Sequence, residues 1–153
     1  MGRVGFAAYQ RLTDHYRLRV VGVDYDGPPR IERLAAEGLR VIEGDATDLY
    51  FWNQLRRSGS VRIAVLAMPR HGANVTALEC LRESGFSGKV AAVARYDDEV
   101  QWARDHGVGI ASMSMRARDW SWPIRWPVAT HPPEWSSANR RRTATALTAG
   151  RCR

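Results

Sequence analysis

The sequence predicts an α/β fold with a Rossmann-like, doubly wound parallel sheet, and three observations lead to this prediction. Apolar runs alternate with segments of helical period along residues 1–110. Some of these runs are apolar throughout, as expected of strands covered on both faces. Turn and cap residues separate the two kinds of segment. Strands alternating with helices of this length form right-handed βαβ units and hence a parallel sheet.

The first elements are predicted from periodicity and from residues that start or stop helices. A helical segment with Ala7, Ala8 and Leu12 on one face precedes a β-branched strand over 18–24. Proline in the opening turn and glycine at the end predict a helix over 28–37. Residues 39–43 form the next predicted strand.

The same reasoning continues to residue 110. Asp48 is placed to cap a helix, and the acids of residues 97–99 suit the positive end of another. The predicted helices are residues 49–57, 71–84 and 97–105, and the predicted strands are 61–68, 89–94 and 108–110.

The basic charge of the chain lies mostly in its last part. Residues 1–110 hold 15 Lys and Arg against 14 Asp and Glu, whereas residues 111–153 hold 8 against 2. Four of the six tryptophans also fall after residue 110. We therefore expect two parts: an α/β domain over 1–110 and an irregular, disordered basic tail over 111–153.

Several classes of protein have little support in the sequence. No apolar run approaches the roughly 20 residues of a membrane span, so we expect a cytoplasmic protein without direct membrane insertion. Cys80 and Cys152 lack the spacing of a zinc site, and no metal site is expected. An Arg-rich tail would allow nucleic-acid binding, but the nearly neutral body argues against it.

A short glycine motif near the start of the chain indicates a ligand. Gly2, Arg3, Val4 and Gly5 precede the first helix, and Asp24 ends the next strand 19 residues after Gly5. In a dinucleotide-binding fold, glycines at this turn admit the pyrophosphate to a helix N-terminus, and an acid about 20 residues on binds the ribose. A carboxylate there repels a 2′-phosphate and favours NAD(H). Because only the last two glycines of G-x-G-x-x-G are present, a simple helix-start glycine pair is the alternative.

These segments together resemble a known family. Gly-Arg-Val-Gly, Val-Val-Gly-Val-Asp-Tyr-Asp and the Gly44-Asp45-Ala46-Thr47 element are similar to the TrkA-N (RCK N-terminal) domain, and the likeness covers about residues 2–110. Asn74 and the segment Leu66-Ala67-Met68-Pro69 continue it. The resemblance implies a regulatory domain that binds NAD(H) or another adenine nucleotide and acts with a membrane potassium channel, uptake system or antiporter subunit, commonly as a homo-oligomer.

The resemblance also assigns a cofactor site. Gly2, Arg3, Val4 and Gly5 would line the pyrophosphate, and Asp24 would bind the adenosine ribose with Tyr25 beside it. Asp45 and Ala46 would lie by the adenine, and Met68 and Pro69 would close the crevice. Each also has a plain structural interpretation: Asp45 as a turn residue, Met68 as core, Arg3 as a solvated charge.

No catalytic residues are expected. The sequence has no Tyr-x-x-x-Lys pair and no nucleophile elbow, and His71 reads as a surface residue at a helix start. The alternative function is a small NAD-dependent oxidoreductase or epimerase of Rossmann type.

The resemblance to the family fails at both ends of the chain. The first strand of a doubly wound sheet would precede Met1, so the fold is expected to lack it and to bind nucleotide weakly. In the strand order 3-2-1-4-5-6, this absence would expose edges on the second and fourth strands. After about residue 111 the sequence is interpreted as altered, as by a shifted reading frame.

Overall fold

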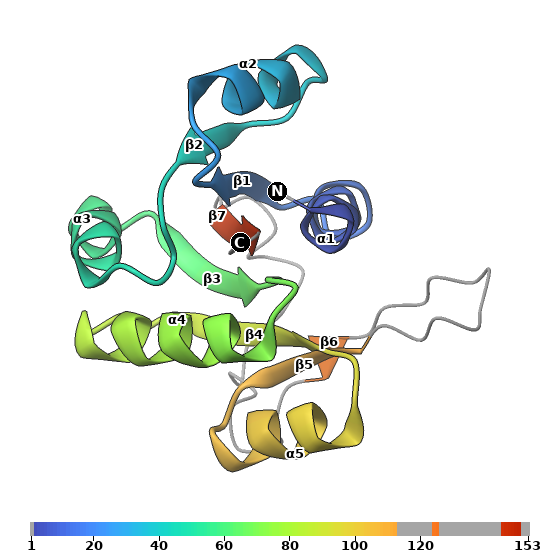
Figure 1. Cartoon of the computed structure of the whole chain (residues 1–153), viewed down its shortest axis with the longest axis vertical. Coiled ribbons are helices and arrows are strands. Elements are labelled where there is room, and N and C mark those ends of the chain that lie inside the picture. The colour runs from blue at the N-terminus through green and yellow to red at the C-terminus, as the bar shows by residue number, and fades with distance from the viewer. Residues whose placement is uncertain (1, 113–123, 126–144, 151–153) are drawn as a thin grey trace.

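A computed structural model gives the fold, and it describes residues 2–112, 124–125 and 145–150. Helices and parallel strands alternate along residues 3–112, which confirms the predicted α/β class (Figure 1). The strands are β1 (Arg19–Asp24), β2 (Val41–Glu43), β3 (Val61–Leu66), β4 (Lys89–Ala94), β5 (Gly109–Ser112), β6 (Ile124–Arg125) and β7 (Thr145–Gly150). The helices are α1 (Arg3–Asp14), α2 (Pro28–Ala36), α3 (Leu49–Ser58), α4 (His71–Glu83) and α5 (Asp97–Asp105).

The strands form one sheet in the order β2-β1-β7-β3-β4-β5-β6. Every pairing is parallel except that of β5 with β6, which is antiparallel. The parallel part has the doubly wound order, with the chain crossing from one half of the sheet to the other between β2 and β3. Such folds bind ligands at the carboxyl ends of the strands on either side of this reversal in strand order.

The position expected to be empty is occupied by a strand from the other end of the sequence. No strand leads into α1 within the described residues, yet β7 lies between β1 and β3 and pairs in parallel with both. Within the part expected to form an irregular tail, residues 124–125 (β6) and 145–150 (β7) thus form strands of the sheet. The exposed edges expected on β1 and β3 are paired. The rest of the tail lies outside the described residues.

Helices cover both faces of the sheet, as the apolar strands predicted. On one face, Tyr9 and Leu12 of α1 and Leu34 of α2 pack on Val20 and Val65. On the other face α3, α4 and α5 pack on alternate residues of the same strands. Their buried contacts are Trp52, Leu78, Leu81 and Ala103 against Val23, Ala64, Leu66 and Ala92. This alternation follows from the two-residue repeat of a strand.

Capping residues set most element ends where the sequence predicted them. The Asp48 carboxylate accepts a hydrogen bond from the Tyr50 amide at 2.9 Å and so caps α3. Gly38, Gly59 and Gly85 have positive φ angles just after their helices, a conformation that glycine adopts without strain.

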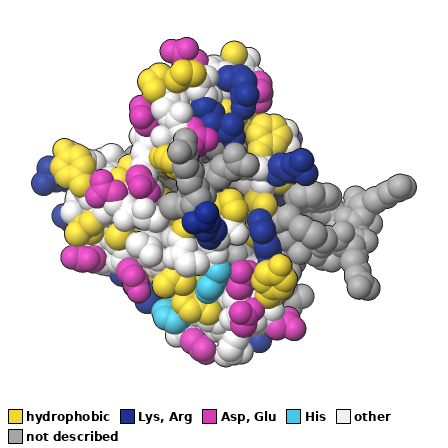
Figure 2. All heavy atoms as spheres, in the orientation of Figure 1, with side chains coloured by type: hydrophobic (Ala, Val, Ile, Leu, Met, Phe, Trp, Pro, Cys, Tyr) yellow, Lys and Arg dark blue, Asp and Glu magenta, His cyan; other side chains and the backbone are white. Residues whose placement is uncertain are grey.

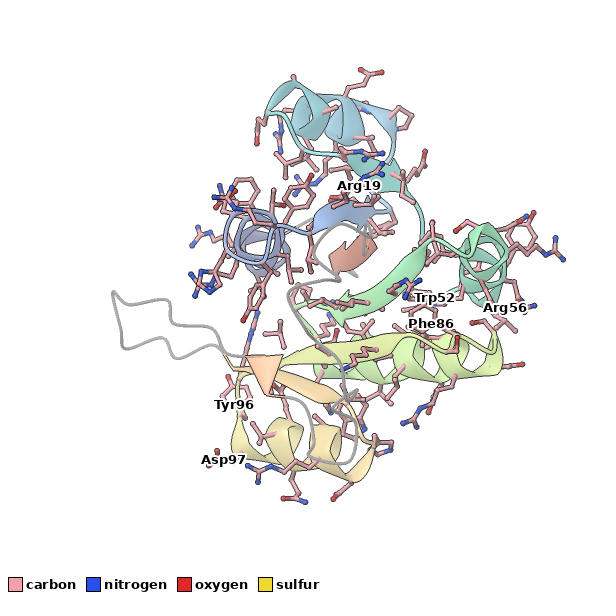
Figure 3. The ribbon with its side chains drawn as sticks, turned by 180° about the vertical axis from the view of Figure 1, so that it is seen from behind. Arg19, Trp52, Arg56, Phe86, Tyr96 and Asp97 are labelled. Carbon is pink, nitrogen blue, oxygen red and sulfur yellow. The ribbon has the colours of Figure 1, made fainter. Side chains whose placement is uncertain are left out.

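The turn into β4 is closely packed. A Cβ on Gly88 would lie 2.6 Å from the Arg62 carbonyl and 2.3 Å from the Phe86 ring, so only glycine fits there. Phe86 in turn packs toward Trp52 of α3, with ring centroids 6.5 Å apart (Figure 3). This contact fixes α3 against the end of α4.

Candidate functional site

The predicted site residues follow the carboxyl ends of neighbouring parallel strands. Asp24 ends β1, Asp45 comes two residues after β2, and Met68 comes two residues after β3. Parallel strands end at one edge of the sheet, so the topology brings these segments to the same edge. α1 packs against β1 and β7 (Figure 1), and the short connection from α1 to β1 places its N-terminus at this edge too.

The N-terminus of α1 presents the Gly2-Arg3-Val4-Gly5 segment. Gly2 is the N-cap residue and gives no side-chain cap, and the first turn contains no acidic residue. Arg3 is exposed, whereas Gly5 is buried. The first amide groups of a helix have no intrahelical acceptor and carry a partial positive charge, so this end is suited to an anion.

Asp24 is fully buried and forms an ion pair that the sequence did not reveal. Its Oδ2 accepts a hydrogen bond from Arg30 Nε at 3.0 Å, and its Oδ1 accepts one from the Asp26 amide at 3.3 Å. Arg30 Nε also lies 3.3 Å from Asp26 Oδ2. The side chain of Arg30 is 23% exposed, so one partly solvated guanidinium lies between two carboxylates.

Tyr25 follows the buried acid and has an unusual hydroxyl. Its side chain is half-buried, and the hydroxyl oxygen is screened from solvent without a hydrogen-bonding partner. A buried polar group without a partner is uncommon, because it loses its hydrogen bonds to water and gains none in return. The hydroxyl lies immediately after the acid predicted to bind ribose.

The Gly44-Asp45-Ala46-Thr47 element is a turn stabilised by hydrogen bonds between its own residues. Asp45 Oδ1 accepts hydrogen bonds from the Thr47 amide at 2.8 Å and the Thr47 hydroxyl at 2.7 Å. The buried Ala46 offers its carbonyl to Trp52 Nε1 at 2.7 Å. The Gly44 amide donates to the Asp24 carbonyl at 2.9 Å, which ties this turn directly to the end of β1.

The segment after β3 is held by Asn74 of α4. Asn74 is 2% exposed; its Oδ1 accepts from the Met68 amide at 3.1 Å and its Nδ2 donates to the Met68 carbonyl at 3.3 Å. Met68 is buried and Pro69 is exposed. The strand predicted to reach residue 68 ends at Leu66, because the Met68 backbone bonds to Asn74 rather than to the sheet.

A second polar group lies over α5, apart from the predicted site residues. The His71 ring packs edge-on against Trp102 at 4.9 Å, and its Nδ1 lies 3.9 Å from Glu99 Oε1. Glu99 Oε2 accepts from the Arg95 amide at 2.6 Å. Figure 2 shows acidic and histidine side chains gathered on this part of the surface. The acids Asp97, Asp98 and Glu99 lie in the first turn of α5, where the sequence predicted them.

The structure brings together the segments that hold all ten predicted residues, but some of the groups already have partners. Asp24 bonds to Arg30, Asp45 to Thr47, and Ala46 to Trp52. Whether these residues bind a nucleotide stays a prediction. Sequence reasoning missed Arg30; its position in the first turn of the helix after Asp24 was the available signal.

Within residues 2–112, 124–125 and 145–150, no helix is long and apolar enough to cross a membrane. In the same part of the chain, no group of three or more His, Cys, Asp or Glu side chains is arranged to hold a metal ion.

Comparisons with known proteins agree with the observed α/β fold. The family model described as the TrkA-N domain matches residues 1–114, which is more than half of the chain. A search of curated protein sequences gave no significant match. Among solved structures, the chain is similar to the TrkA-N domain of the inner membrane protein YbaL from Escherichia coli. The identity is 20%, the TM-score is 0.56, and the match covers 74% of this chain and 82% of that chain. At this identity, the likeness to YbaL shows a shared fold.

Proposed function

Because the chain belongs to the TrkA-N domain family, we propose that it is an NAD(H)-sensing regulatory domain of a potassium transport system. TrkA-N domains are regulatory Rossmann folds that bind NAD(H) and are associated with potassium transport. The observation that carries the proposal is the buried Asp24 carboxylate at the end of β1, beside the turn of Gly44 and at the same edge as the N-terminus of α1.

The charges around Asp24 favour NAD(H) over NADP(H). The Arg30 guanidinium lies against the carboxylates of Asp24 and Asp26. A ribose with free hydroxyls can donate hydrogen bonds to a carboxylate, whereas a 2′-phosphate is repelled by it. The second carboxylate adds to this repulsion.

Sensing would act through the contacts that Asp24 already makes. The carboxylate has no exposed surface, so a ribose reaches it only if the groups that cover it, the Arg30 guanidinium among them, move. A ligand that binds the moved arrangement more tightly shifts the population toward it. A membrane-embedded potassium transporter subunit, or a second copy of the domain, would read this shift at the cytoplasmic side of the membrane.

Catalysis is not part of the proposal. His71 is the histidine nearest in sequence to the segment after β3, and its ring packs on Trp102 beside Glu99. These contacts account for it as a surface residue that holds α4 near α5. Nothing in the described residues favours the oxidoreductase or epimerase alternative.

The test compares nucleotide binding by the full chain and by matched Asp→Asn variants. Isothermal titration is expected to show tighter binding of NADH than of NADPH. Asp24→Asn should weaken NADH binding by about tenfold, the equivalent of roughly 1.4 kcal/mol. The control is Asp14→Asn, an exposed residue at the other end of α1. No NADH binding by the unaltered chain, or equal binding by the two variants, would refute the proposed site.

A further inference from the structure

β7 is the central strand of the parallel sheet, although it comes from the end of the sequence. Its six residues pair with all six residues of β1, from Arg19 with Thr145 to Asp24 with Gly150. On its other side it pairs with β3, from Val61 to Leu66. In the doubly wound order this is the place of the strand that normally leads into α1.

The register places Gly150 at the candidate site. Gly150 is the partner of Asp24, the residue predicted to bind ribose, and neighbouring strands lie about 4.8 Å apart. Because β7 runs parallel to β1 and β3, its last residue lies at the edge where both of those strands end. That edge also carries the N-terminus of α1, which packs on β7.

The arrangement restores a glycine that the sequence motif lacks. In G-x-G-x-x-G the first glycine ends the central strand and the other two begin the helix. Here Gly2 and Gly5 stand at the start of α1, and Gly150 ends the central strand. The sheet, instead of a continuous chain segment, holds these glycines at one edge.

We propose that β7 is part of the nucleotide site: Gly150 and the Gly2–Gly5 segment together form the phosphate-binding surface. This inference rests on the nucleotide binding proposed above. A glycine at position 150 has no side chain to keep a pyrophosphate from the backbone beside the ribose acid, and the strand pairs with both β1 and β3. Nucleotide binding then depends on residues 145–150, which lie outside the family match.

The first arm of the test asks whether β7 is in place, without any nucleotide. Hydrogen–deuterium exchange is measured on the full chain, on Leu147→Pro and on the control Thr143→Pro, which lies before the strand. A proline inside a central strand removes a ladder hydrogen bond. Leu147→Pro should therefore speed exchange across residues 19–24 and 61–66, and Thr143→Pro should not. Unchanged exchange in Leu147→Pro would overturn the proposal.

The second arm asks whether Gly150 faces the nucleotide. Valine suits a strand, so Gly150→Val should keep the slow exchange of β1 and β3 while weakening NADH binding by about tenfold or more. Equal NADH affinity in Gly150→Val and the unaltered chain would overturn the role of Gly150 and leave the proposed function standing. If the unaltered chain binds no NADH, the proposed function fails together with the nucleotide role of β7. The exchange data then still show whether β7 pairs with β1 and β3.

Discussion

At the scale of single residues, the candidate site is defined by polar groups that already have most of their partners. The Asp24 carboxylate accepts from Arg30 and from the Asp26 amide. A ribose hydroxyl that reaches this carboxylate donates to oxygens that already accept hydrogen bonds. Binding then requires movement of Arg30, whose Nε lies 3.0 Å from Oδ2.

Tyr25 allows binding and stability to be separated. Tyr25→Phe removes a buried hydroxyl that has no partner, so the free energy of unfolding should stay the same or rise by up to about 1 kcal/mol. If the hydroxyl binds the nucleotide, NADH affinity should fall several-fold. Urea denaturation and titration with NADH measure the two quantities on the same preparation. A loss of stability with unchanged affinity would assign the hydroxyl a structural role instead.

Cys80 gives a prediction that depends on pH. Burial, and then the nearby Glu83, Asp48 and Glu79 carboxylates, raise the pKa of the Cys80 thiol. The Sγ donates to the Thr47 carbonyl at 3.3 Å. Since the folded state favours the neutral thiol, the stability it contributes is present below the unfolded pKa. That stability is lost as the pH rises through the folded pKa.

Alkylation measures this difference because the thiolate is the reacting species. In a Cys152→Ser background, the folded chain should react with iodoacetamide more slowly at pH 8 than the same chain in guanidinium. The rate for the folded chain should level off at a higher pH. Equal rates in the two states at pH 8 would contradict the raised pKa.

At the scale of elements, two glycines provide a matched pair of substitutions. Gly88→Ala places a Cβ against the Arg62 carbonyl, and backbone cannot move away cheaply, so a loss of about 1–3 kcal/mol is expected. Gly72 lies in α4 with open space around its Cβ position. Gly72→Ala should therefore stabilise the chain by up to about 1 kcal/mol. Urea denaturation of both variants tests the prediction, and shifts in the same direction would contradict it.

The predictability of the elements depends on local signals. α3 begins after Asp48 because its side chain caps the helix, and α2 begins with two prolines; both signals are visible in sequence. β7 has no such signal. The string Thr-Ala-Leu-Thr-Ala-Gly forms a strand here because β1 and β3 offer two unpaired edges, and context of this kind decides strand formation more than residue type does.

The position of the site could be predicted because the sequence pattern predicts where the strands end. Asp24, Asp45 and Met68 each lie at or just after the end of a strand that periodicity identified, so their position at one edge follows from parallel topology. The Arg30 ion pair joins a strand end to a helix across a loop, and the bonds from Asn74 to Met68 join a helix to a strand end. Such contacts depend on loop geometry, which the sequence pattern does not specify.

At the scale of the whole molecule, the central place of β7 bears on how the protein folds during synthesis. β1 is made more than a hundred residues before its partner β7, and β3 roughly eighty residues before it. Until residues 145–150 leave the ribosome, the pair β2-β1 and the group β3-β4-β5 lack the strand that joins them among the described residues. Pairings this distant in sequence form slowly, and unpaired strand edges promote aggregation meanwhile. The growing chain thus depends on β7 to unite the two halves of its sheet.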